Sequence, residues 1–156
     1  MNSHSLWIYK CNAKPYAVQP ALGGNWCDFF SEPSQPTQWG GTYITENNMS
    51  LKNIRNGMQP GDFVLAWQTD QRAAVGLCRL TELRQDGGPD DLKIIMEPVG
   101  QMFSRPVKIL EMKKTNPALA NVKAFQKGLA GTIYATDEHE ADLLLATCGI
   151  DPKILD

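Results

Sequence analysis

The sequence predicts an α+β fold: a mixed, barrel-like β-sheet of about six strands with about three short helices beside it. Two observations lead to this class. Short β-rich segments follow one another directly along the chain, and the clearest helical patterns are short and lie mostly in its second half. The length of 156 residues and a hydrophobic content of 42% suit one globular core. We therefore interpret residues 1–156 as a single domain.

The N-terminal third alternates one strand with a long irregular connection. SLWIYKC, residues 5–11, is short and rich in aromatic and β-branched residues, and predicts an opening strand. The connection up to residue 37 is rich in proline, and only WCDFF (26–30) within it suggests a helical turn. SLKNIRNG (50–57) predicts a helix, with Ser50 as its N-cap and Gly57 just beyond its end.

The middle of the chain predicts a series of adjacent strands. QPGD (59–62) predicts a turn, because proline and glycine favour turn conformations. DFVLAWQT (62–69) and AAVGLCRLTEL (73–83) are apolar segments joined by a short polar one, which is typical of a hairpin. LKIIMEPV (92–99) and RPVKILEM (105–112) are then expected to be two further strands.

The C-terminal part predicts helix, strand and helix. Asn116 as N-cap, Pro117 and Gly128 delimit a helix, and GTIYAT (131–136) follows as a strand. DEHEADLLLATCG (137–149) predicts the last helix. Its acidic start fits a capping box between Asp137 and Glu140 better than a metal site, and HEADL does not match H-E-x-x-H.

Several classes of function are disfavoured by composition and motifs. The net charge of −2 disfavours non-specific coating of nucleic acid, which needs many phosphate contacts. The four cysteines form no C-x-x-C pair and the glycine pairs match no nucleotide-binding loop, so we expect neither metal nor cofactor and interpret the cysteines as free thiols. With no apolar run long enough for a membrane span and no signal-peptide pattern, we expect a cytoplasmic protein.

The charges are unevenly distributed along the second half of the chain. Residues 93–127 contain seven basic residues against two acids, a local balance of +5, whereas residues 128–156 contain six acids against one lysine, a balance of −5. The basic segment could contact phosphates, or the two segments could form solvated faces that attract each other. The sequence leaves both interpretations open.

Trp39 is the most unusual aromatic residue, because two glycines follow it within a polar segment, TQWGGTYI. Glycines allow a ligand to approach the backbone closely, and a tryptophan ring beside exposed N–H groups suits a nucleobase. Trp7 and Phe63 are expected in the core. Alternation places Phe63 and Trp67 on one face of their strand and Gln68 on the other, and polar residues follow Trp67 at the strand end.

Four pieces in the same order resemble the EVE domains of the PUA-like superfamily, which are related to the YTH domains. They are the tryptophan-containing first strand with its downstream Asn and Pro, WGGTY, the Gly-Asp turn with two strands in MQPGDFVLAWQT and AAVGLCRLTEL, and the closing strand–helix–strand–helix order. The resemblance covers most of the chain. It implies a PUA-like barrel that reads a modified base in DNA or RNA without catalysis, with nucleic acid as partner and a separate effector protein acting on what is read.

The resemblance also implies roles for individual residues. The Lys-Ser-Asn step of the related readers corresponds here to Lys10-Cys11-Asn12, and their pocket tryptophan corresponds to Trp39. Trp39 would be the stacking wall and Asn12 the reader of the base edge. Cys11 stands where serine is usual, so the modification recognised could differ from familiar ones. The complete implied base-binding set is Lys10, Cys11, Asn12, Trp39, Gly40, Gly41, Thr42, Trp67 and Gln68.

Two alternatives stay open at the level of sequence. ASCH domains of the same superfamily resemble small amidohydrolases of modified nucleosides, and Lys10 or Lys14 with Thr42 and Glu46 could supply comparable groups, although the G-x-K-x-x-x-R signature is absent. The second alternative is a protein-interaction module of PUA-like fold. It predicts that Trp39 is buried against the chain itself.

Overall fold

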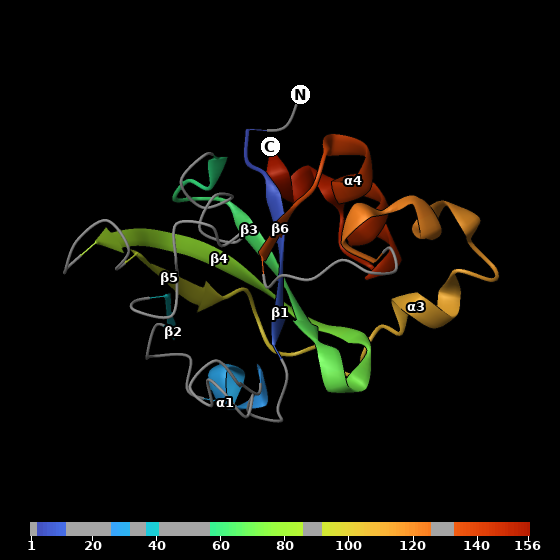
Figure 1. Ribbon diagram of the computed structural model, residues 1–156, viewed down its shortest axis with the longest axis horizontal. Coiled ribbons are helices and arrows are strands. Elements are labelled where there is room, and N and C mark those ends of the chain that lie inside the picture. Colours follow the sequence, from blue (N-terminus) through green and yellow to red (C-terminus); the bar gives the residue numbers. More distant parts are fainter. Residues whose placement is uncertain (1–2, 12–25, 32–36, 41–56, 86–91, 126–132) are drawn as a thin grey trace.

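The computed structural model describes residues 3–11, 26–31, 37–40, 57–85, 92–125 and 133–156. Within these ranges six strands form one sheet in the order β2-β5-β4-β3-β1-β6 (Figure 1). The strands are β1 (Leu6–Cys11), β2 (Thr37–Gly40), β3 (Phe63–Gln68), β4 (Ala73–Gln85), β5 (Leu92–Pro98) and β6 (Ile133–Ala135).

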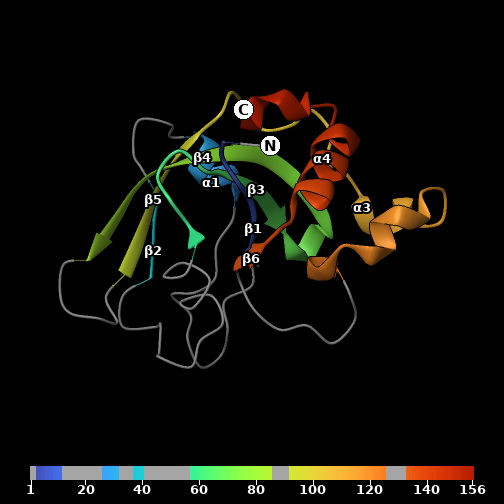
Figure 2. The same cartoon turned by 90° about the horizontal axis from the view of Figure 1, so that it is seen from above.

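The sheet is mixed and open. β1 and β3 run parallel, and every other neighbouring pair is antiparallel. Among the described residues β2 and β6 are the two edges, so the expected closure into a barrel is not observed. β4 is long and curved in both views (Figures 1 and 2), and its pairing with β5 shifts register between Leu80 and Glu82. Such bulges bend a sheet without closing it.

Helices cover both sides of the two parallel strands (Figures 1 and 2). The α-helices of the described residues are α1 (Trp26–Ser31), α3 (Ile109–Met112) and α4 (Glu138–Thr147). Short 3-10 helices are η3 (Thr69–Gln71), η4 (Pro117–Asn121), η5 (Lys123–Phe125) and η6 (Pro152–Leu155). None of the described helices has the length and apolar character required to cross a membrane.

The core has two parts because side chains alternate along β1 and β3. We call one side the α4 face: it carries Ile8, Leu65 and Trp67, which pack with Leu144 of α4. We call the other the α1 face: it carries Tyr9, Val64 and Ala66, which pack with Trp26 of α1. The predicted alternation of Phe63, Leu65 and Trp67 against Gln68 is confirmed, as is the burial of Trp7 and Phe63.

The predicted strand over residues 105–112 is wrong. Val107 forms only an isolated bridge with Ala74, and the chain then turns into α3, which buries Ile109. A short apolar run such as VKIL does not distinguish a strand from a helical turn by periodicity. Conversely, β2 lies in a segment without a strand prediction, where the polar residues around Trp39 hid an edge strand.

The other element predictions vary in outcome. The turn at residues 59–62, the hairpin of β3 and β4, the short helix at Trp26 and the last strand are confirmed. The predicted helix after Asn116 is observed as two 3-10 helices, η4 and η5, and the predicted stop at Gly128 lies outside the described residues. The helix predicted over residues 50–57 also lies outside them, except for Gly57.

The capping box at the last helix is confirmed. The Asp137 carboxylate accepts from the Glu140 backbone N–H at 2.7 Å, and the Glu140 carboxylate accepts from the Asp137 N–H at 3.1 Å. Glu140 also accepts from the Lys123 N–H of η5 at 2.8 Å. This bond joins the basic and acidic segments through a backbone N–H and does not involve the charge of Lys123.

Candidate nucleic-acid-binding site

The carboxyl ends of β1 and β3 bring four of the nine predicted site residues together. The two strands are parallel, and their register pairs Lys10 with Trp67 and Cys11 with Gln68. Because side chains alternate, the first pair lies on the α4 face and the second on the α1 face. The predicted residues therefore belong to two separate surroundings at one end of the sheet.

On the α1 face, the Gln68 carboxamide joins three segments. Its side chain is 1% exposed. Its oxygen accepts from the Trp26 backbone N–H at 2.9 Å. Its nitrogen donates to the Cys11 carbonyl at 3.3 Å and to the Asp70 carboxylate at 2.7 Å. Gln68 thus fixes the start of α1 against the end of β1.

Aromatic rings pack together on the same face of the sheet. The Trp26 indole N–H donates to the Trp67 carbonyl at 3.0 Å, which fixes the ring over the end of β3. The Trp26 ring lies edge-on to Tyr9 at a centroid distance of 5.2 Å and to Phe29 at 5.4 Å. Gly76 leaves room for the adjacent Phe30, since a Cβ at position 76 would lie 2.3 Å from the ring.

The surroundings of Cys11 favour its neutral thiol form. Burial raises its pKa to about 12, and a hydrogen bond with Tyr9 lowers the pKa by a smaller amount. Burial likewise raises the pKa of Tyr9 well above its ordinary value. Both groups are therefore neutral at physiological pH and can act only as hydrogen-bonding and packing groups. None of the four cysteines, all of which lie in the described residues, forms a disulfide.

On the α4 face, Lys10 and Trp67 line a pocket of about 370 Å³. The Trp67 and Phe125 rings lie 4.7 Å apart, tilted by 42°, and are 3% and 7% exposed. The Lys10 amine donates to the Ala124 carbonyl and lies 4.5 Å from the centroid of the Tyr134 ring. Burial and the nearby Lys113 ammonium lower the pKa of Lys10.

Two further predicted site residues, Trp39 and Gly40, lie on β2. In β2 the register pairs Trp39 with Ile94 and Gly40 with Lys93. β5, β4 and β3 separate β2 from β1 within the sheet. The other predicted positions, Asn12, Gly41, Thr42, Lys14 and Glu46, lie outside the described residues.

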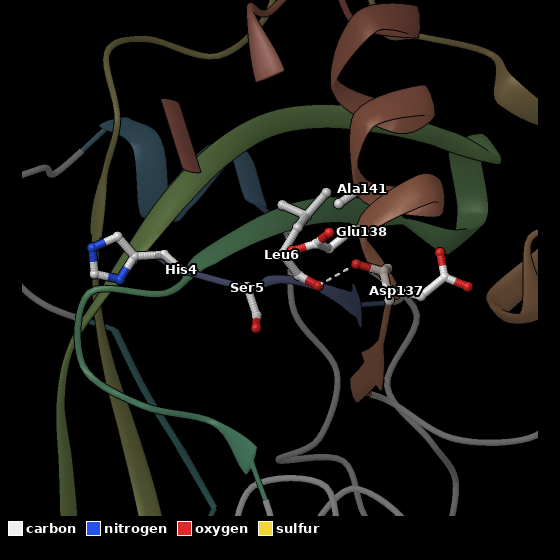
Figure 3. A pocket seen from close by; sticks show the side chains of 7 residues that line it. His4, Ser5, Leu6, Asp137, Glu138 and Ala141 are labelled. Atoms are coloured by element: carbon white, nitrogen blue, oxygen red, sulfur yellow. Dashed lines mark hydrogen bonds between the residues drawn. The ribbon is translucent and has the colours of Figure 1, made fainter. Parts of the chain in front are cut away.

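A second, smaller pocket lies beside the amino end of α4 (Figure 3). Its volume is about 50 Å³, room for ordered water but not for a base. His4 lies on one side of it and the Asp137 carboxylate on the other, directed away from each other in Figure 3. The described residues contain no cluster of His, Cys, Asp or Glu that could hold a metal.

Two residues that pack near the ends of β1 and β3 were not predicted as site residues from the sequence. Trp26 was visible in WCDFF as a tryptophan at the start of a helical turn, and it supplies the central ring of the α1 face. No sequence pattern indicated Phe125, because its ring contact with Trp67 depends on the tertiary packing of η5 against the sheet.

No protein-family model matches the sequence, and no curated protein has significant similarity to it. Solved structures do resemble it. Human THYN1 in complex with DNA containing 5-methylcytosine matches with a TM-score of 0.69 and 17% identity, over 95% of this chain and 99% of that one. Protein Atu2648 from Agrobacterium tumefaciens matches with a TM-score of 0.69 and 18% identity, over 93% and 91%.

The DUF55 domain of human thymocyte nuclear protein 1 matches with a TM-score of 0.69 and 16% identity, over 96% of this chain and all of that domain. Similarity at this level of identity establishes the fold and leaves individual residue roles open. The chain therefore has the fold of the DUF55 domain, an EVE-type PUA-like fold, as the sequence resemblance predicted.

Proposed function

We propose that this protein is a non-catalytic reader that binds a modified nucleobase of DNA or RNA. The single observation that carries the proposal is the shared fold: nearly the whole chain superimposes on a human protein crystallised with DNA containing 5-methylcytosine. A fold alone does not fix a function, so the arrangement at the strand ends must supply the recognition chemistry.

We place base recognition at the strand ends of the α1 face, where the buried Gln68 and Trp26 support the site and do not themselves read the base. Cys11 and Gln68 end adjacent strands, and the Gln68 carboxamide is bonded to the Trp26 backbone N–H and to the Cys11 carbonyl. Amides and carbonyls read the edge of a base, and an aromatic ring packs against its face. Asn12 directly follows Cys11 in the sequence, and we propose that it reads the base edge. Trp39 lies on β2, with three strands between it and β1, and is proposed as the stacking wall on the strength of the sequence resemblance alone.

The energetics favour discrimination by hydrogen bonds. Extracting a base from a duplex costs a few kcal/mol, and stacking on an aromatic ring returns about 1–3 kcal/mol. Desolvating one methyl group adds about 0.8 kcal/mol. Because these contributions nearly cancel, the base edge must be read by Asn12 and by the backbones of Cys11, Gly40 and Gly41, with Thr42 as a further wall. Binding by this domain alone should be weak, and a separate effector would act on what is read.

The amidohydrolase alternative gains no support. Of the lysine, threonine and glutamate residues that it would use, the structure describes only Lys10. The Lys10 amine donates to the Ala124 carbonyl on the α4 face, away from Cys11 and Gln68. None of the described residues places this amine near the other groups that a hydrolase of this kind would need, so we retain the reader as the proposal.

Fluorescence anisotropy with labelled oligonucleotides tests the reader directly. Matched single-stranded and duplex probes would carry cytosine, 5-methylcytosine or 5-hydroxymethylcytosine at one position. We expect one modified probe to bind about tenfold more tightly than its unmodified copy. Trp39→Ala should abolish this preference while Trp39→Phe, which keeps a ring, retains part of it. Equal affinity for all probes, or a preference that survives Trp39→Ala in a folded protein, would refute the proposal.

A further inference from the structure

The pocket on the α4 face is large enough for a small organic ligand. Its volume of about 370 Å³ lies within the range of roughly 300–1,000 Å³ typical of ligand pockets. It opens at the carboxyl ends of β1 and β3, between η3 and η5. The residues that matter for its chemistry are Lys10, Trp67, Thr69, Arg72, Leu110 and Phe125.

One part of this pocket is apolar and aromatic. The rings of Trp67 and Phe125 are packed together and almost fully buried, so their positions are fixed by the core. Leu110 of α3 adds an aliphatic wall. Rigid aromatic walls suit a planar ring, which can make contact without ordering flexible side chains.

The other part is cationic. Lys10 is half-buried, whereas Arg72 is exposed and is held in the left-handed region at φ 53° by its N–H bond to the Thr69 carbonyl at 3.1 Å. None of the described residues that line the pocket is acidic. A guanidinium and an ammonium beside apolar walls are the groups that bind a phosphate or a carboxylate.

Two further lysines add to the positive charge at the rim. The Lys108 amine donates to the Gln71 carbonyl at 2.9 Å, directly before Arg72. The Lys113 amine donates to the Phe125 carbonyl at 2.9 Å. Lys113 also lowers the pKa of Lys10, which means that the two ammonium groups repel each other in the folded protein. A bound anion would relieve this repulsion.

We propose that this pocket binds an organic anion that carries a planar ring, the chemistry of a mononucleotide. The phosphate lies at Lys10 and Arg72, and the ring lies against Trp67 and Phe125. The site is distinct from the proposed base-reading surface, because it lies on the opposite face of β1 and β3 from Cys11 and Gln68. It does not depend on the proposed function.

Isothermal titration calorimetry of the full chain with CMP and AMP tests the proposal. Cytidine, which lacks the phosphate, and inorganic phosphate, which lacks the ring, are the comparison ligands. We expect a mononucleotide to bind at least about tenfold more tightly than either part, because charge and ring contacts act together. Arg72→Asn should weaken binding about tenfold, the loss of one charge-assisted hydrogen bond, while asparagine tolerates the left-handed backbone. Lys10→Gln should act similarly, and Lys153→Gln on η6 serves as the charge control.

The absence of heat with any mononucleotide up to millimolar concentration would overturn the proposal. So would wild-type affinity in both Arg72→Asn and Lys10→Gln variants that melt like the wild type. Competition with a short single-stranded oligonucleotide identifies the source of the ligand: displacement of CMP indicates a nucleotide within a strand, and simultaneous binding indicates a free nucleotide. Because Trp39→Ala should leave CMP binding unchanged, failure of the reader proposal and failure of this one are separable.

Discussion

The two faces of β1 and β3 contain different chemistry at the same strand ends. On the α1 face, the polar group is the Gln68 carboxamide, which is buried and bonded to Trp26, Cys11 and Asp70. On the α4 face, the polar group is the Lys10 ammonium, half-buried above the Tyr134 ring and next to an open pocket. The Gln68 carboxamide joins secondary-structure elements, whereas the Lys10 ammonium is a charged group close to a cavity.

This difference shows how a parallel strand pair can carry two sites. Adjacent positions on one strand point to opposite faces, so Lys10 and Cys11 are one residue apart in sequence but lie in different surroundings. A set of site residues transferred by sequence motif therefore combines residues from both faces. Substitutions on each face can show whether the two faces are as independent as their contacts indicate.

The largest contrast should come from replacing the two polar groups by methionine. Gln68→Met leaves the Trp26 N–H and the Cys11 carbonyl without their partner in a buried site, and should lower the free energy of unfolding by about 2–4 kcal/mol. Lys10→Met should change it by about 1 kcal/mol or less, since the lost hydrogen bond is offset by the removal of a half-buried charge. Urea unfolding measures both. Equal losses would contradict the contrast between the two faces.

A smaller effect is expected from crowding the α1 face. Gly76→Ala places a Cβ 2.3 Å from the Phe30 ring, so the ring and α1 must shift, at a cost of about 1–3 kcal/mol. The matched control is Gly57→Ala, whose Cβ would meet the Trp7 ring at an ordinary 3.4 Å. Thermal unfolding of the two variants should differ clearly. A Gly76→Ala variant as stable as Gly57→Ala would show that α1 does not pack as described.

Much of this architecture could be predicted from the sequence, and the reasons are local. The hairpin of β3 and β4 has two apolar segments separated by a polar turn, and the Asp137–Glu140 capping box is a short-range pattern. The edge strand β2 and the helix α3 were missed because their states depend on tertiary partners: Thr37–Gly40 on pairing with β5, and Ile109 on burial in the core.

The candidate site was less accessible to sequence reasoning. The pairing of Cys11 with Gln68 follows from a parallel register between segments about 57 residues apart, which no local pattern encodes. The pocket on the α4 face needs Phe125 of η5 to meet Trp67 of β3, another long-range contact. The sequence pattern did not indicate that the predicted site residues at the ends of β1 and β3 divide between two faces.

Cysteine reactivity should follow burial on the α1 face. With a pKa of about 12, roughly one Cys11 thiol in ten thousand is ionised at pH 8. Cys27 of α1 is exposed and should be alkylated by iodoacetamide first, faster than Cys11 by about a hundredfold or more. Peptide mass spectrometry resolves the order, and alkylation in urea provides the control. Comparable rates in the folded protein would mean that the partly buried Cys11 thiol is not shielded in this way.

The smallest effect concerns the charge on the α4 face. Because the pKa of Lys10 is lowered from its ordinary 10.5, the unfolded chain binds more protons between the two pKa values. The Lys10 contribution to stability therefore rises with pH across that interval. Any stability advantage of Lys10→Met over the wild type should shrink as the pH rises from about 7 towards 10. A difference that does not change with pH would show that the Lys10 pKa is not lowered.

The most direct test of the reader proposal is an amide-resolved NMR titration with a single-stranded oligonucleotide that carries one 5-methylcytosine, and with its unmethylated copy. We predict that the signals of Cys11, the Gln68 carboxamide and the Trp26 indole shift more strongly and at lower concentration with the methylated strand. Identical responses to the two strands, or shifts confined to the basic residues 93–125, would contradict recognition of the base and indicate contact with phosphates alone.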